Sequence, residues 1–377
     1  MFGVFSNSGF LILLMMAFVL QQPETLFLGG CLCAAYAIFS AKNFHLERRR
    51  FFAALMAVFV SSLAVLSFNH GPSPVFYLIS TFSAFYAAKY FSDYSIKHIS
   101  RCLEIVFWLA IVAIGCVLWR YWGYPEPLGE VVPGTSTNGI PSYLIVFQIA
   151  LSLSVFLDKK RLPVWSPVFT LAVAVIGLGR GSIIVAAAIL FLSVFVDFFL
   201  KEMKPLSRLV IVVFSVIFFV VIVFVFRFYF DDELFFDELI NGSKFSEGLL
   251  DPYRAEIFDE YVRKLDLFSI FFGADYSGTV IASRYDGNPH IAYVRTHAYF
   301  GLFGLLLVIL SPLAILVSSK RRLYKFVFIS FISFAMIRAI SEPIFFPTLL
   351  DFFYFLYFFI FFKYAPTAMF KNGRPTC

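Results

Sequence analysis

The sequence predicts an all-α polytopic membrane protein with about twelve membrane-spanning helices and one large external loop that contains short amphipathic helices. Two observations lead to this fold class. Hydrophobic residues make up 60% of the chain and charged residues only 14%, which is far from the balance of a soluble domain. Apolar runs of roughly 20 residues alternate with short polar connections, and a helix of that length crosses the hydrocarbon core of a bilayer.

The apolar runs occupy most of the chain. We expect spans near residues 4–21, 25–41, 51–68, 74–92, 102–122, 139–157, 163–179, 182–200, 208–228, 291–317, 323–340 and 348–364. A single long polar segment interrupts them and contains more than half of the acidic residues. The chain therefore divides into a first group of nine spans (1–229), the large loop (230–290), and a last group of three spans with a tail (291–377).

Lys and Arg residues cluster in alternate connections between the spans. The clusters contain Lys42, Arg48, Arg49, Arg50, Lys97, Arg101, Lys159, Lys160, Arg161, Lys201, Lys204, Arg208, Lys320, Arg321, Arg322, Lys325, Lys363, Lys371 and Arg374. The short connections between them, near residues 22, 69–74 and 123–138, contain no Lys or Arg. By the positive-inside rule the basic connections and both termini are cytoplasmic, and the large loop is external. The rule also explains the net charge of +6 without a nucleic-acid partner.

Arg180 and Arg338 depart from this rule, because they lie at the outer ends of spans. An arginine within a membrane costs about 2.5–3.5 kcal/mol on insertion scales, so it usually faces a cavity and a partner. The segment 177–182, Gly-Leu-Gly-Arg-Gly-Ser, surrounds Arg180 with small residues that leave room for a ligand. The alternatives are snorkelling of Arg180 to the surface and an ion pair of Arg338 with Glu342.

The large loop is predicted to contain an amphipathic helix. Asp251 and Pro252 form an N-cap followed by proline at the first helical position. Apolar residues then recur at helical spacing, which predicts a helix that lies on the membrane surface and ends at Gly273. The apolar residues are Tyr253, Ile257, Tyr261, Leu265 and Phe268.

Arg254 falls in the first turn of this helix, where a cation opposes the helix dipole. This position favours a role in ligand binding; the alternative is an ion pair with Asp251 or Glu256. Arginines that converge at the outer surface indicate an anionic ligand, because guanidinium binds phosphate oxygens bidentately and keeps its charge when partly desolvated. An anion at that depth of a membrane is a lipid-linked phosphate or pyrophosphate.

The loop ends in Asn288-Pro289-His290, and this sequence predicts a helix with His290 in its first turn. The positive end of a helix favours neutral imidazole, which suits a general base. His297 lies further along the same predicted face. For His297 a structural role is the better interpretation.

The order of these features resembles the O-antigen polymerase and O-antigen ligase superfamily of bacterial envelope polysaccharide synthesis. Members have ten to fourteen spans, an arginine motif between two earlier spans, and a large periplasmic loop late in the chain. The matching residues here are Gly179-Arg180-Gly181, Arg254, Phe272-Gly273, Pro289-His290 and Gly301-Leu302-Phe303-Gly304.

The resemblance implies glycosyl transfer in the bacterial inner membrane, on its periplasmic side. Donor and acceptor are glycans linked to undecaprenyl pyrophosphate, and the partners include the bilayer, a chain-length regulator and a flippase. Arg254 and His290 are expected to be catalytic, and Arg180, Arg295 and Arg338 to bind pyrophosphate. No cofactor or metal is expected, and the acidic run Asp231-Asp232-Glu233 is interpreted as a solvated charge cluster rather than a metal site.

Two alternatives remain. Many ligases of this superfamily have Asn after the histidine, whereas this chain has Ile291, which favours a polymerase over an O-antigen ligase that transfers glycan to lipid A-core. A lipid-linked oligosaccharide flippase can also have twelve spans. A transporter should instead carry broken or polar helices near the bilayer midplane and short loops on both sides.

Overall fold

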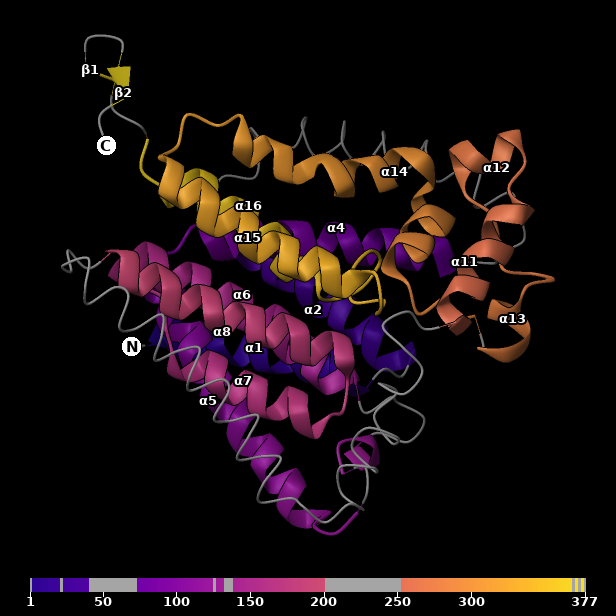
Figure 1. Ribbon diagram of the computed structural model, residues 1–377, viewed down its shortest axis with the longest axis horizontal. Coiled ribbons are helices and arrows are strands. Elements are labelled where there is room, and N and C mark those ends of the chain that lie inside the picture. The colour runs from indigo at the N-terminus through magenta and orange to yellow at the C-terminus, as the bar shows by residue number, and fades with distance from the viewer. Residues whose placement is uncertain are drawn as a thin grey trace.

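The computed structural model describes residues 2–20, 23–40, 73–124, 127–131, 138–200, 252–285, 287–367, 370–371 and 374–375. Within them the chain forms thirteen α-helices and one 3-10 helix, Gly129–Val131. Two short strands, β1 (Phe370–Lys371) and β2 (Arg374–Pro375), pair as a small antiparallel hairpin in the tail (Figure 1). The predicted all-α class is confirmed for these residues.

Ten of the twelve predicted spans correspond to helices. They are α1 (Phe2–Leu20), α2 (Pro23–Ser40), α4 (Ser73–Ser92), α5 (Ile96–Arg120), α6 (Gly139–Lys159), α7 (Trp165–Ile176), α8 (Arg180–Leu200), α14 (Ala292–Leu316), α15 (Arg322–Ala339) and α16 (Asp351–Tyr364). The predicted spans near residues 51–68 and 208–228 lie outside the described residues, as does the first part of the large loop.

Three of the described helices, α5, α6 and α14, are long and apolar enough to cross a membrane. Four further apolar stretches are shorter: Val4–Val19, Phe27–Ile38, Trp165–Ile176 and Arg180–Val196. The protein therefore has the features of a membrane protein.

The helices run side by side and alternate in direction, which gives the bundle two distinct ends (Figure 1). At one end, here called the basic end, Lys159 pairs with Glu104 at 3.5 Å and Lys363 pairs with Asp93 at 3.0 Å. Lys320 there donates to the Ala365 carbonyl at 2.6 Å. At the other end, the capped end, α11 (Pro252–Lys264), α12 (Leu267–Phe272) and α13 (Val280–Arg284) gather beside the start of α14.

Helix α6 forms the centre of the bundle and packs against α5, α7, α8, α15 and α16. It is mostly apolar, as expected for a helix surrounded by other helices, and almost every residue from Gly139 to Leu157 is buried. Its polar residue Gln148 donates to Ser152 at 2.7 Å and to Ser166 at 3.1 Å, and accepts from Thr170 at 3.2 Å. This Gln148 network joins α6 to α7.

The predicted helix is divided into two: α11 begins at Pro252 and ends at Lys264, and α12 ends before Gly273. The break falls at Leu265 and Asp266, because the Asp266 side chain caps a new helix. The orientation of α11 differs from the prediction. Ile257 and Tyr261, on the apolar face that was expected to lie on the membrane, are instead buried against the start of α14 together with Val294 and Ala298. This face of α11 packs against the protein itself, because α14 provides an apolar surface at the capped end.

Two glycines allow α12 and α14 to approach closely. A Cβ atom at Gly273 would lie 2.4 Å from the His297 carbonyl oxygen, and one at Gly301 would lie 2.3 Å from the Phe271 carbonyl oxygen. Gly301 also has φ 65° and ψ −170°, so α14 is kinked there, and its ribbon changes direction in Figure 1. These backbone positions require glycine, because any side chain would collide with the neighbouring backbone.

The predicted span 291–317 matches α14, but the N-terminal motif Asn288-Pro289-His290 does not start that helix. Helix α14 begins at Ala292 with Ile291 as its N-cap, so Pro289 is not the first helical residue and His290 precedes the helix. The Asn288 side chain accepts a hydrogen bond from the His290 N–H at 3.1 Å, which closes a local turn instead of capping a helix.

Candidate anion-binding site

At the capped end, Arg338 and Glu342 form a buried ion pair. Arg338 lies in the last turn of α15, and Glu342 follows four residues later in the connection to α16. The guanidinium approaches the carboxylate to 3.2 Å, with side-chain exposures of 2% for Arg338 and 11% for Glu342. This is the pairing that the sequence offered as the alternative to a ligand role for Arg338.

The Arg338 guanidinium is also held by hydroxyl groups. Its Nε and Nη2 atoms donate to the Ser142 hydroxyl of α6 at 3.1 and 2.7 Å, and Nη1 donates to Ser341. Ser142 in turn donates to the carbonyl of Asn138 at 2.6 Å. The planar fork of Arg338 is therefore fixed in orientation by partners from two separate parts of the chain.

Arg254 reaches the same acid from the large loop. It extends from the first turn of α11 to within 3.8 Å of the Glu342 carboxylate, and 30% of its side chain is exposed. Asp251, one of the partners considered from the sequence, lies outside the described residues. Two arginines 84 positions apart thus converge on one buried carboxylate.

The Gly179-Arg180-Gly181 motif lies beside this cluster. A Cβ at Gly181 would lie 3.1 Å from Nη1 of Arg338, and one at Gly179 would lie 2.0 Å from Oδ1 of Asn138. Leu178, with φ 53°, turns the chain sharply between α7 and α8. The glycines let the turn approach the guanidinium, so Arg180 starts α8 within this end of the bundle.

We call Arg254, Arg338, Glu342, Ser142 and Gly181 the arginine site. Tyr143 lies next to it in α6, close enough for its hydroxyl to be affected by the charges of Glu342, Arg295 and Arg338. Arg295 lies 5.3 Å from the centre of the Tyr77 ring, in a cation-π contact between α14 and α4. Arg295 also acts on the buried Asp351 carboxylate, so among the described residues Glu342 is the carboxylate that Arg254 and Arg338 share.

His290 lies at the edge of the capped end, in the turn before α14. Its φ is 53°, a left-handed conformation that is uncommon for residues other than glycine. Its half-buried ring meets the Tyr285 ring edge to face at 5.2 Å. Because a helix dipole acts mainly within the first turn, the electrostatic argument for His290 is weaker than the sequence suggested.

His297 has a structural role, in line with the interpretation preferred from the sequence. Its Nε2 lies 2.8 Å from the Ile270 carbonyl and therefore carries the proton, which leaves Nδ1 to accept from the Tyr261 hydroxyl at 2.8 Å. Burial raises the pKa of Tyr261 well above its ordinary value, so this hydroxyl stays protonated and able to donate. The contacts tie α11 and α12 to α14.

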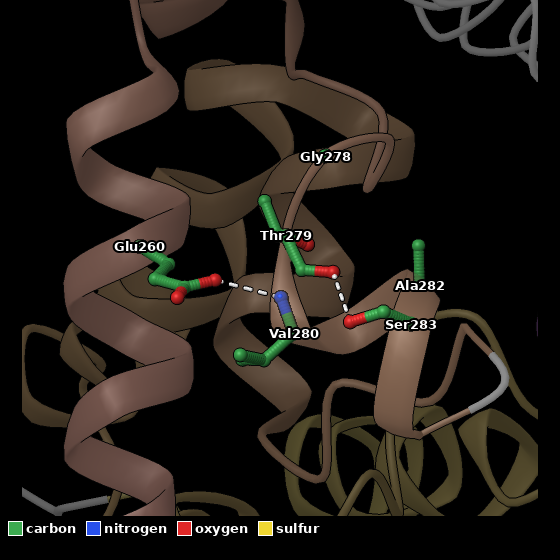
Figure 2. A pocket seen from close by; sticks show the side chains of 6 residues that line it. All are labelled: Glu260, Gly278, Thr279, Val280, Ala282 and Ser283. Carbon is green, nitrogen blue, oxygen red and sulfur yellow. Dashed lines mark hydrogen bonds between the residues drawn. The ribbon is translucent and has the colours of Figure 1, made fainter.

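A hollow of about 430 Å³ opens elsewhere on the large loop, between α11 and α13. Figure 2 shows that the Glu260 carboxylate accepts from the Val280 N–H at 2.6 Å, and that Ser283 donates to the Thr279 carbonyl at 3.2 Å. These hydrogen bonds satisfy backbone groups at the start of α13. The residues of the arginine site do not line this hollow.

In the part of the chain that the structure describes, no three His, Cys, Asp or Glu side chains group as metal ligands could. The acidic run 231–233 lies outside that part. Ser142, a member of the arginine site, and Tyr143, its neighbour, were not predicted from the sequence. Their only signal is polarity at the outer end of an apolar run, which many membrane helices share.

The arrangement is a candidate anion site. Guanidinium groups from two segments, Arg338 of α15 and the partly exposed Arg254 of α11, meet at Glu342, with Gly181 next to Arg338. Comparison with protein-family models, with curated proteins and with solved structures gave no match to this chain.

Proposed function

We propose that the protein is a membrane glycosyltransferase that polymerises oligosaccharide repeat units linked to undecaprenyl pyrophosphate. The observation that carries this proposal is the convergence of Arg254 and Arg338 on Glu342 next to Gly181. Two of the motifs that carry the resemblance, Arg254 and Gly179-Arg180-Gly181, contribute to this cluster and support the proposal. The product would be O-antigen or a related surface polysaccharide.

In the proposed reaction a sugar hydroxyl of the acceptor attacks the anomeric carbon of the donor glycan. A new glycosidic bond forms, and the bond to pyrophosphate breaks. Undecaprenyl pyrophosphate leaves with the bonding electrons, while His290 takes the proton of the attacking hydroxyl. Arginines stabilise the negative charge that develops on the leaving group, a contribution that needs no metal.

The two arginines have different roles in this proposal. Arg338 is almost fully buried and held by Ser142, so it provides a fixed positive group. Arg254 is partly exposed, and its 3.8 Å separation from Glu342 is longer than the 2.7–2.9 Å of a strong charge-assisted hydrogen bond. An arriving pyrophosphate would draw Arg254 away from Glu342, with Arg180 and Arg295 completing the positive surroundings.

The orientation follows from charge. The basic end carries Lys159, Lys320 and Lys363, which by the positive-inside rule faces the cytoplasm. The capped end then faces the periplasm, where the lipid-linked donor is available. With the two spans expected near residues 51–68 and 208–228, the total is twelve and both termini are cytoplasmic.

The test is chain extension by purified protein supplied with lipid-linked repeat units, together with the surface glycan of cells that carry each variant. Loss of a polymerase leaves single-repeat glycan on the cell surface, whereas loss of a flippase leaves none. We expect His290→Ala to lower chain extension about 100-fold, the usual size of a general-base contribution. A well-expressed His290→Ala protein that makes full-length chains would remove His290 from the mechanism.

A further inference from the structure

Helix α12 is apolar on nearly every side and yet buries none of its side chains. Five of its six residues are Leu, Ile or Phe, and Leu267 is 79% exposed. The helix is nevertheless well formed, because Asp266 and Ser269 make a capping box at its start. A short ordered helix of this composition exposes a surface that soluble proteins avoid.

The exposed surface extends onto α11. Phe258 is 51% exposed and Val262 is 44% exposed, one helical turn apart. They lie next to Ile257 and Tyr261, which are buried on the neighbouring face of the same helix. The buried strip holds α11 to α14, and the exposed strip leads along α11 towards the two-residue connection to α12.

The position of α12 relative to α14 indicates what covers this surface. The Phe271 carbonyl lies against Gly301, at the kink of α14. The outward-facing apolar side chains of α14 begin directly after the kink with Phe303 and continue with Leu307 and Leu310. Because α14 is a candidate membrane-spanning helix, α12 lies at the level where its lipid-facing surface starts.

We propose that α12, together with the Phe258 and Val262 strip of α11, inserts into the interfacial region of the outer leaflet of the bilayer. Six helical residues extend about 9 Å, and interfacial helices bury their apolar faces about 5–10 Å into the boundary between headgroups and acyl chains. Continuity with the exposed face of α14 favours lipid over a protein partner. This insertion does not depend on the proposed enzymatic activity.

Insertion fixes the height of the loop above the membrane. Helix α12 connects to α11 through two residues, and His297 bonds both helices to α14. The first turn of α11 carries Arg254. Anchoring α12 in lipid therefore sets how far Arg254 stands from the headgroups.

The experiment uses nitroxide labels on the full chain in lipid nanodiscs. The five native cysteines are first replaced, and single cysteines are then introduced as Leu267→Cys and Ile270→Cys in α12. Phe303→Cys provides a lipid-exposed reference, and Ser283→Cys in α13 provides an exposed polar reference. Collision of each label with molecular oxygen and with a water-soluble nickel chelate is measured by electron paramagnetic resonance.

We expect both α12 labels to collide preferentially with oxygen, as Phe303→Cys does, and Ser283→Cys to collide with nickel. Labels in α12 as accessible to nickel as Ser283→Cys would show that the surface faces water and would overturn the proposal. Labels shielded from both reagents would also overturn it, because a second copy of the chain or another protein would then cover α12. Using two positions guards against one variant that fails to fold.

Discussion

The Gln148 network and the arginine site both include residues of α6, but their polar groups are balanced in different ways. In the Gln148 network, neutral amide and hydroxyl groups satisfy one another between two adjacent helices. In the arginine site, charged groups from distant segments converge on a single carboxylate. A closed neutral network is sufficient to hold two helices in register, whereas two guanidinium groups that share one carboxylate fit the anion site proposed above.

The largest effect is expected for Arg338→Ala. Removing one partner of a buried ion pair costs about 3–5 kcal/mol, because the remaining charge stays buried. We expect a large fall in thermal stability, measured by size-exclusion chromatography of the detergent-solubilised protein after heating. We also expect loss of chain extension.

The matched control for that variant replaces both charges with apolar residues, Arg338→Met with Glu342→Met. It should recover most of the stability and none of the activity, because it leaves no unpaired acid but also no fixed guanidinium. If the double variant extended glycan chains normally, Arg338 would have only a structural role.

Arg254→Ala separates function from stability. Arg254 is 30% exposed and lies near the start of α11, outside the membrane-spanning helices, so we expect the protein to remain folded. Loss of one group that stabilises developing charge lowers a rate about 100- to 1,000-fold. Chain extension by purified protein measures this.

Arg263→Ala is the matched control for Arg254→Ala, since it changes the same residue type at the exposed far end of the same helix. It should leave the rate nearly unchanged. Equal losses in the two variants would mean that the general charge of α11 matters, and that the arginine site does not bind the substrate anion.

Glu342→Gln tests the competition between the carboxylate and an incoming anion. With the negative charge removed and the shape kept, Arg254 and Arg338 are available to pyrophosphate at all times. We expect inorganic pyrophosphate to bind about tenfold more tightly, equivalent to roughly 1.4 kcal/mol, as measured by calorimetry. Weaker binding would show that Glu342 supports the anion site and does not compete with it.

The smallest effect is expected in the neutral network. Gln148→Ala removes hydrogen bonds that join α6 to α7, and such bonds within membrane proteins contribute about 0.6 kcal/mol on average. A small fall in thermal stability and an unchanged rate of chain extension are expected. A loss of activity as large as that of Arg254→Ala would erase the distinction between the two clusters.

The described helices could be predicted from hydropathy because a membrane requires each crossing segment to satisfy its own backbone hydrogen bonds. Gly273 was predicted from the end of the amphipathic segment, and Gly301 from the family resemblance. Their physical reason, the close approach of α12 to α14, became visible only in three dimensions. The partner of Arg254 was also beyond prediction, since Glu342 is far away in the chain.

Local sequence therefore determined the all-α class, the order of the helices and the separation of basic and capped ends, because composition and periodicity act over short stretches of chain. Tertiary packing decided which face of α11 is buried, where α14 begins, and which residues gather around Arg338. Those outcomes depend on side chains that meet across the bundle. The position of Ser142 next to Arg338 follows from the packing of α6 against α15, and no pattern within either helix encodes it.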